Sequence, residues 1–434
     1  MVILLAPYLT GKIAETQTHN IVNQLNSTLQ LDNRLEQSGH TEILSYQRNF
    51  YNSQVSYQVK LSPQYSAFFD NSEQVEFSCD VDHNVISVDY LCNVTNNPFY
   101  SNLISTYFKG DDPISISGNV NAFGDFKGGL TIEQIDNLKL QDDGEISIAK
   151  TQFNVNTDKT LSNYNISGGT NKLSFKTSTE SVLVDNLVLT GDLKEIDGGL
   201  FTGDFNFSIA NTVLKDINNT VSIQGLNTTG NAELNGDNMD SETAVKIDKI
   251  TLANAPYEVA ENLNLMLTVN GVNKEALVEY QALSQKLQQQ MLNENQSTEI
   301  GLADIGPVLE RMLDKGFNLN FGLSGKLDNN ENAFSFDLEL LQSITMDDII
   351  ALAYAPLETL DKLDISIASQ FHENTVNADP KLAASVINSP LFEKSNNEYL
   401  MDMKIGPQIE LNGTTLTIEE LSAIITAAAM QQVQ

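Results

Sequence analysis

The sequence predicts a mainly β protein (α+β), built as a large, elongated antiparallel sheet or meander with a few helices. Three observations support this prediction. Short segments in which apolar and polar residues alternate recur along the chain, as in half-buried strands. Clusters of Asn, Asp, Gly and Thr separate them at roughly 8–12-residue intervals, which is typical of antiparallel β structure. Helical periodicity is confined to the N-terminus, residues 273–315 and the C-terminus, with short pieces between.

Alternation is clearest at Val55, Tyr57, Val59 and Leu61, where every second residue is apolar. The other predicted strands are 114–120, 145–149, 182–189, 205–209, 221–226, 245–252, 263–269, 317–323, 333–340, 363–371, 399–405 and 408–411. The predicted turns are 142–144, 197–199, 227–230, 235–237 and 328–330. Asn412-Gly413 is a further, strong hairpin signal because both residues accept the positive φ of a tight turn.

A few segments have helical periodicity instead. Residues 11–30 place Ile21, Leu25 and Leu29 on one narrow apolar stripe. The clearest helix is 273–293, and further helices are expected at 302–315, 346–354 and 380–387. Residues 417–420 read Thr-Ile-Glu-Glu, a capping box that opens a last helix at 418–430. We expect that helix to turn Leu421, Ile424 and Ile425 inward.

The N-terminus is unusually apolar. Residues 1–9 read MVILLAPYL, which is shorter than the ~20 residues of a membrane-spanning helix and lacks the basic start and cleavage site of a signal peptide. We interpret residues 1–11 as the remnant of an N-terminal membrane anchor; a short buried strand or an apolar tail is the alternative. The predicted organisation continues with a helical stalk at 12–32 and an antiparallel β-rich region at 41–270. Residues 271–434 add helices, further strands and the C-terminal helix, packed on the same body.

Charge excludes some classes of function. The net charge is −33, with 57 acidic against 24 basic residues. A nucleic-acid-binding protein needs a cationic surface, and binding to anionic lipid through a basic patch needs the same. Hydrophobic residues make up 41% of the chain, as expected for a folded protein. Aromatic residues make up 7% and Trp is absent, so large aromatic cages are not expected.

The chain contains two cysteines, Cys79 and Cys92. Neither belongs to a C-x-x-C motif or to a Cys/His pattern with zinc spacing. Strand-like residues flank both, so the two ends of this short loop could be folded together. Two interpretations therefore stay open: a disulfide formed in an oxidising compartment, or two ordinary buried thiols.

No catalytic motif is present. His372-Glu373 begins like the zinc motif H-E-x-x-H, but Val376 occupies the position of the second histidine. Residues 231–242 have the oxygen spacing of a calcium-binding EF-hand loop. However, Asn231 stands where Asp is usual and the flanks alternate like strands, which favours a polar turn. We predict no catalytic, cofactor-binding or metal-binding residues, no cofactor, and no enzymatic activity; a hydrolase is a distant third hypothesis.

Several short motifs together resemble a known family. They are Tyr8–Lys12, Asn23–Asn26, Tyr46–Ser53, Gln408–Gly413 and the start of the last helix at Leu416–Leu421. In these residues and in the order of the elements between them, the chain resembles the YdgA-like family of Gram-negative envelope proteins of unknown function. The resemblance implies one N-terminal inner-membrane anchor and a body on the periplasmic side.

One departure from that family concerns a turn. Asp82-His83 is followed by Asn84-Val85, where the family often has Asp-His-Gly-Pro. The family has no established catalytic residues, so the resemblance implies none here.

Two functional hypotheses follow. In the first, a curved sheet shields or carries lipid, or another apolar envelope component, in a groove. In the second, the body is a periplasmic scaffold that interacts with other envelope proteins. The expected partners are the membrane through the anchor, and lipid or envelope proteins; nucleic acid is excluded. Inward residues that leave an open apolar trough would favour the first hypothesis, and an exposed apolar patch or sheet edge the second.

Overall fold

The computed structural model describes residues 2–31, 40–61, 74–95, 97–121, 123–139, 144–196, 199–253, 258–292, 302–348, 351 and 359–431. Strands make up 58% of the protein and form a large antiparallel sheet, which confirms the predicted fold class. The chain divides into two compact units. The N-terminal unit comprises Met1–Leu173, Val188–Gly203 and Gln281–Glu299, and the C-terminal unit the remainder. Strands β10 (Asn163–Lys176), β11 (Ser181–Glu195) and β12 (Phe201–Lys215) contribute residues to both.

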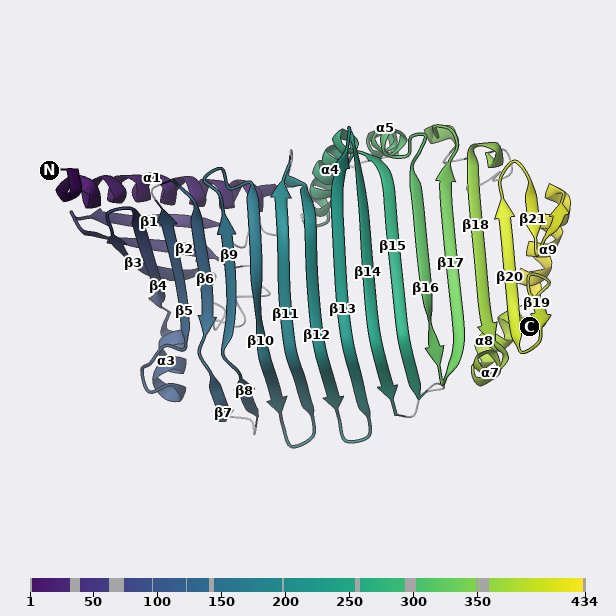
Figure 1. Ribbon diagram of the computed structural model, residues 1–434, viewed down its shortest axis with the longest axis horizontal. Helices are drawn as coiled ribbons and strands as arrows, with labels where there is room; N and C mark the ends of the chain where they lie inside the picture. The colour runs from purple at the N-terminus through teal and green to yellow at the C-terminus, as the bar shows by residue number, and fades with distance from the viewer. Residues whose placement is uncertain are drawn as a thin grey trace. The chain divides into compact units, whose positions relative to one another are not determined.

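The N-terminal unit contains a long helix and a run of antiparallel strands (Figure 1). The strands pair in the order β1-β2-β3-β4-β5-β6-β9-β10, and β7 pairs with β8. The elements are α1 (Val2–Leu31), β1 (Thr41–Arg48), β2 (Asn52–Lys60), β3 (Gln74–His83), β4 (Ser87–Thr95), α3 (Pro98–Tyr107), β5 (Ile114–Asn121), β6 (Phe126–Ile132), β7 (Ile135–Lys139), β8 (Glu145–Ile148) and β9 (Thr151–Thr157).

The C-terminal unit contains a second run of antiparallel strands, which pair in the order β13-β14-β15-β16-β17-β18-β20-β21-β22. Strand β19 also pairs with β20. Its strands are β13 (Thr220–Asn235), β14 (Asn238–Leu252), β15 (Val259–Asn273), β16 (Asn318–Leu327), β17 (Asn330–Leu340), β18 (Leu363–His372), β19 (Glu393–Ser395), β20 (Glu398–Ile405), β21 (Ile409–Leu411) and β22 (Thr414–Leu416). The helices are α5 (Leu302–Met312), η4 (Leu360–Lys362), α7 (Glu373–Ala378), α8 (Pro380–Val386) and α9 (Ile418–Gln431), while α4 (Lys274–Leu292) contributes to both units.

Helix α1 packs on one face of the N-terminal strands. Ala14 is fully buried in a core cluster with Val55, Val81 and Val88. Two polar contacts support this packing. Arg48 of β1 forms a 2.7 Å ion pair with Glu15, and the Thr10 hydroxyl donates a 2.8 Å hydrogen bond to the Asn84 carbonyl. The predicted helix at 11–30 is confirmed; the stalk and the domain boundaries predicted from sequence stay predictions.

One close approach between α1 and the sheet depends on a glycine. A Cβ on Gly11 would lie 2.4 Å from Cε1 of the His83 ring. That ring is buried, and its Nε2 lies 2.8 Å from the Ser53 hydroxyl oxygen. Burial lowers the pKa of His83, opposed by the hydrogen bond between Nδ1 and the Phe50 carbonyl. Of the Asp-His pair noted in the sequence, His83 therefore takes part in helix packing, while Asp82 is exposed.

The C-terminal elements follow their local sequence signals closely. Asn412 and Gly413 have φ values of 49° and 75°, as the predicted hairpin turn requires. The capping box is complete, because the Glu420 amide donates to the Thr417 hydroxyl (3.2 Å) and the Thr417 amide donates to the Glu420 carboxylate (2.7 Å). Leu421 is buried in a core cluster with Met401, Met403 and Leu411 of the strands.

Some sequence predictions were wrong. Residues 227–230 are not a turn: they lie inside β13, where Asn227 pairs with Lys246 and Gly230 with Thr243, because unbroken pairing with β14 overrides the turn-like composition. Ile425 is 46% exposed and does not face inward as Leu421 does. Helices α3 and α7 were not predicted. Of the expected helix at 346–354, the structure describes residues 346–348 and 351, which are helical; residues 142–143 and 197–198 of two predicted turns lie outside the described residues.

Replacing Gly11 tests whether α1 is packed as described. In an isolated helix, alanine is favoured over glycine by about 1 kcal/mol. Here the added methyl group meets the His83 ring, so we expect Gly11→Ala to lower the free energy of unfolding by about 1–3 kcal/mol. Urea denaturation measures this change. Thr16→Ala, at an exposed position of the same helix, is the control and should leave stability unchanged or raise it; stabilisation by Gly11→Ala would contradict the packing.

Candidate functional site

The register of the N-terminal strands separates their side chains into two chemically different faces. Every second residue of a strand points to the same side, and strand pairing aligns these sets across the sheet: Tyr57 with Phe77, Cys92 with Ile116, and Leu130 with Phe153. The face that carries these residues is the one on which α1 packs, since Val55 and Val81 belong to it. We call it the N-terminal apolar face.

Helix α1 covers only part of this face. Beneath α1, Val55, Val81 and Val88 are at most 2% exposed. Further along the run the side chains are still apolar but half-buried; these are Ile116, Leu130, Ile132, Phe153, Val155 and Ile166. The N-terminal apolar face therefore continues beyond the helix as a partly exposed surface.

A pocket lies where α1 meets this face. Its volume is about 280 Å³. Ile21 and Val22 line it from the helix, and Tyr57, Phe77 and Phe126 line it from the strands. The neighbouring Tyr90 hydroxyl lies 3.2 Å from the Thr18 hydroxyl oxygen. Burial raises the pKa of Tyr57 to about 12, against a weaker effect of its hydrogen bond with Thr18.

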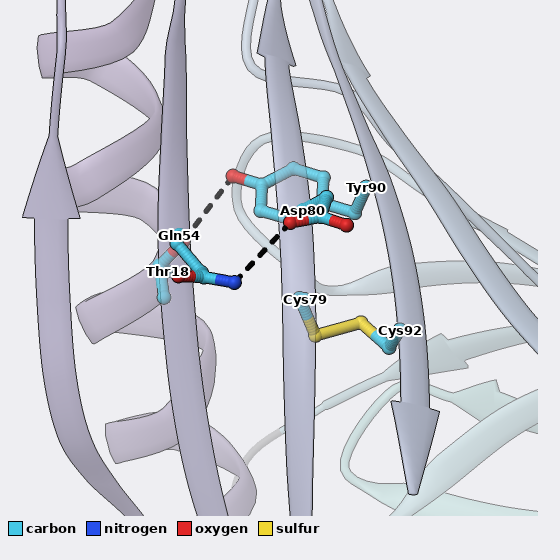
Figure 2. The surroundings of a disulfide bond; sticks show 6 residues. All are labelled: Thr18, Gln54, Cys79, Asp80, Tyr90 and Cys92. Carbon is cyan, nitrogen blue, oxygen red and sulfur yellow. Dashed lines mark hydrogen bonds between the residues drawn. A yellow bond between two sulfur atoms is a disulfide. The ribbon is translucent and has the colours of Figure 1, made fainter. Parts of the chain in front are cut away.

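The disulfide lies in this part of the sheet. Cys79 of β3 and Cys92 of β4 are directly paired across the two strands and are bonded to each other. Figure 2 shows this bridge, with Tyr90 next to it in space and hydrogen bonded to Thr18 of α1. Both cysteines also line the pocket. The sequence left two interpretations open, a disulfide or two buried thiols. The structure contains the disulfide.

The C-terminal unit repeats the same two-faced arrangement. Strand pairing aligns Leu265 with Leu323, Leu267 with Phe321, and Leu323 with Phe334. The Phe321 and Phe334 ring centroids are 6.1 Å apart. In this C-terminal apolar face Leu267 is 37% exposed and Leu323 is 44% exposed. The middle of the face is thus accessible, although it is strongly apolar.

The opposite faces are polar and carry many of the acidic residues. Their carboxylates are often paired with an amide of a nearby strand. Asn119 donates to Asp89 (2.6 Å) in the N-terminal unit, and Asn231 donates to Asp204 (2.7 Å) in the C-terminal unit. Asn320 and Asp337 form a similar pair across β16 and β17. A carboxylate that accepts from an amide needs no cationic partner, which suits a chain so poor in Lys and Arg.

A wider hollow of about 680 Å³ lies on the C-terminal strands. Its lining contains small residues on the polar side of the sheet, including Gly322, Ser324 and Ala333, with Asn264 and Asp402 at its border. A Cβ at Gly322 would meet no atom within 4 Å. The small residues therefore open this hollow, which also has apolar side chains such as Met266, Leu323 and Phe334 in its lining but is more polar than the α1 pocket.

The structure does not bring the histidines and acidic residues noted in the sequence into a reactive group. His372 ends β18 and accepts from the Asn374 amide at the start of α7. Residues 231–242 form the end of the β13–β14 hairpin, with Asn231 paired to Glu242, as the turn interpretation predicts. Within the described residues, no three His, Cys, Asp or Glu side chains are placed to hold a metal ion. The α1 pocket was not predicted from the sequence, although Ile21, Tyr57 and Phe77 each stand in an apolar pattern.

These features define a class: a protein with an amphipathic antiparallel sheet whose apolar face is only partly covered by helix. No helix among the described residues is both long and apolar enough to span a membrane. Residues 1–419 match the family described as bacterial protein of unknown function (DUF945), and the chain belongs to this family. No curated protein and no solved structure matches the chain.

Removing the disulfide tests its contribution to this region. The bond joins residues 13 apart, and closing a loop of about this length stabilises the folded state by roughly 3 kcal/mol through the unfolded chain. We expect the double substitution Cys79→Ala/Cys92→Ala to lower the free energy of unfolding by up to this amount. Urea denaturation of both proteins, with and without reductant, measures the effect. Reductant should then lower the free energy of unfolding of the parent protein only. An equal decrease in both proteins would contradict a role for the bond.

Proposed function

We propose that this protein is a non-enzymatic lipid-binding protein, which shields or carries the apolar part of a lipid along the apolar face of its sheet. One observation carries the proposal: Leu267 and Leu323 lie in the middle of an apolar face and remain 37% and 44% exposed. Contiguous exposed apolar patches are uncommon in soluble proteins and usually mark a binding surface. Covering apolar surface is worth about 25 cal/mol per Å², so a hydrocarbon ligand gains affinity from every side chain it covers.

The strand pairing favours lipid over an extended peptide. In the middle of the C-terminal unit each strand is hydrogen bonded to a neighbour on both sides; β16, for example, pairs with β15 and β17. The apolar face therefore offers side chains but no unpaired backbone groups. A peptide laid on it would have to bury its own amides without partners, which is unfavourable. A hydrocarbon chain has no such groups.

The same proposal includes the cellular location. The motifs that resemble the YdgA-like family support residues 1–11 as the remnant of an inner-membrane anchor, a helical stalk at 12–32 and a body on the periplasmic side. The bond between Cys79 and Cys92 also supports a compartment of this kind, because disulfides persist under oxidising conditions. Lipids of the envelope would then be available to the apolar face.

Two adjacent residues provide a matched test. Leu267 and Met266 are both 37% exposed and point to opposite faces of β15. We expect Leu267→Glu to weaken phospholipid binding at least about tenfold, or ~1.4 kcal/mol, because it places a charge on the apolar face. Met266→Glu should leave binding unchanged. Native mass spectrometry of the full chain, titrated with phosphatidylethanolamine, measures bound lipid for each variant.

The controls separate this proposal from the scaffold hypothesis. Equal loss of lipid from both variants would point to a general effect on the fold, which circular dichroism would detect. An unliganded mass at every lipid concentration would remove the lipid-binding proposal. Crosslinking to envelope proteins in that case would support the scaffold hypothesis instead.

A further inference from the structure

The pocket between α1 and the N-terminal apolar face has the properties of a site for a hydrocarbon chain. Its apolar lining includes Ile21 and Val22 of the helix, and Tyr57, Phe77 and Phe126 of the strands. At about 280 Å³ it has room for roughly nine water-sized groups of ~30 Å³ each. This is enough for part of one acyl chain and too little for a whole phospholipid.

Backbone pairing in the pocket wall excludes the addition of a further β-strand there. Strand β3 pairs with β2 and β4, and β5 pairs with β4 and β6. The wall therefore presents no unpaired strand edge to which another chain could add. The Thr18 and Tyr90 hydroxyls are within hydrogen-bond distance of each other, so these two polar groups of the pocket already have a partner.

Charge indicates the kind of headgroup. The chain carries 57 acidic and 24 basic residues. Such a field repels an anionic headgroup and accepts a zwitterionic one. Because the pocket holds only part of a chain, the remainder of the lipid would have to lie outside it, and the adjacent half-buried part of the N-terminal apolar face (Leu130 and Phe153) continues the apolar surface.

We propose that this pocket holds the methyl end of one acyl chain of a zwitterionic phospholipid. This inference rests on the proposed lipid-binding function and adds the position and orientation of one chain. The lipid then lies with its chain end between α1 and the sheet, and with its headgroup away from the pocket.

The absence of tryptophan makes a direct test possible, because one introduced Trp becomes the sole indole reporter. Phe126→Trp places it in the pocket wall, and Ile21→Trp places a second reporter on the helix side in case the first variant does not fold. Leu91→Trp is the control, since Leu91 is 48% exposed and alternates in β4 with the pocket residues Tyr90 and Cys92. The probe is phosphatidylethanolamine brominated either near the chain end or near the carbonyl group, since bromine quenches nearby Trp emission.

We expect chain-end bromines to reduce Trp emission in the pocket variants more than carbonyl-proximal bromines do, with no loss in Leu91→Trp. Phosphatidylglycerol with the same chains should quench less, and equal quenching would overturn the headgroup assignment. Stronger quenching by carbonyl-proximal bromines would overturn the orientation. If native mass spectrometry shows bound lipid but neither pocket variant is quenched, the pocket site is wrong while the proposed function stands. If no lipid binds, both are wrong.

Discussion

The structure depends on one constraint: in an antiparallel strand, successive side chains point to opposite faces of the sheet. This chain places apolar residues on one set of alternate positions and polar residues on the other through most of its paired strands. A one-residue slip at Leu265–Leu323 would expose the apolar set on the polar side, so the pattern fixes the register as well as the faces. The apolar face must then be covered. Helix α1 covers part of the N-terminal apolar face. In the C-terminal unit α9 packs against β20 and β21, while Leu267 and Leu323 stay accessible.

The acidic composition fits this arrangement. With 57 acidic against 24 basic residues, most carboxylates cannot form ion pairs. The polar faces instead use amide donors, as in the pairs Asn119–Asp89 and Asn231–Asp204. Such cross-strand pairs contribute modestly to stability, but they allow a strongly acidic face without basic residues beside it. The apolar face then differs from its opposite face in charge as well as in hydropathy, which favours a neutral hydrocarbon ligand over a charged one.

The sequence predicted those elements that are stabilised by interactions between neighbouring residues. The capping box at Thr417 and the Asn412-Gly413 turn formed as expected, because each depends on neighbouring residues. Predictions failed where the local structure depends on pairing with a distant strand. Residues 227–230 resemble a turn in sequence, but pairing with β14 keeps them in β13. The α1 pocket could not be predicted, because it depends on how closely the helix approaches the strands. Gly11 against His83 sets part of that distance, and these residues are far apart in the sequence.

The central claim is that one face of the sheet is apolar and accessible until lipid covers it. Hydroxyl-radical footprinting of the full chain, first stripped of lipid and then saturated with phosphatidylethanolamine, tests this most directly. The account predicts that Leu267, Leu323 and Phe334 are oxidised readily in the stripped protein and become protected when lipid is added, while Met266 on the opposite face is oxidised equally in both states. Protection of Leu267 and Leu323 already in the stripped monomer, or no change on adding lipid, would contradict the account.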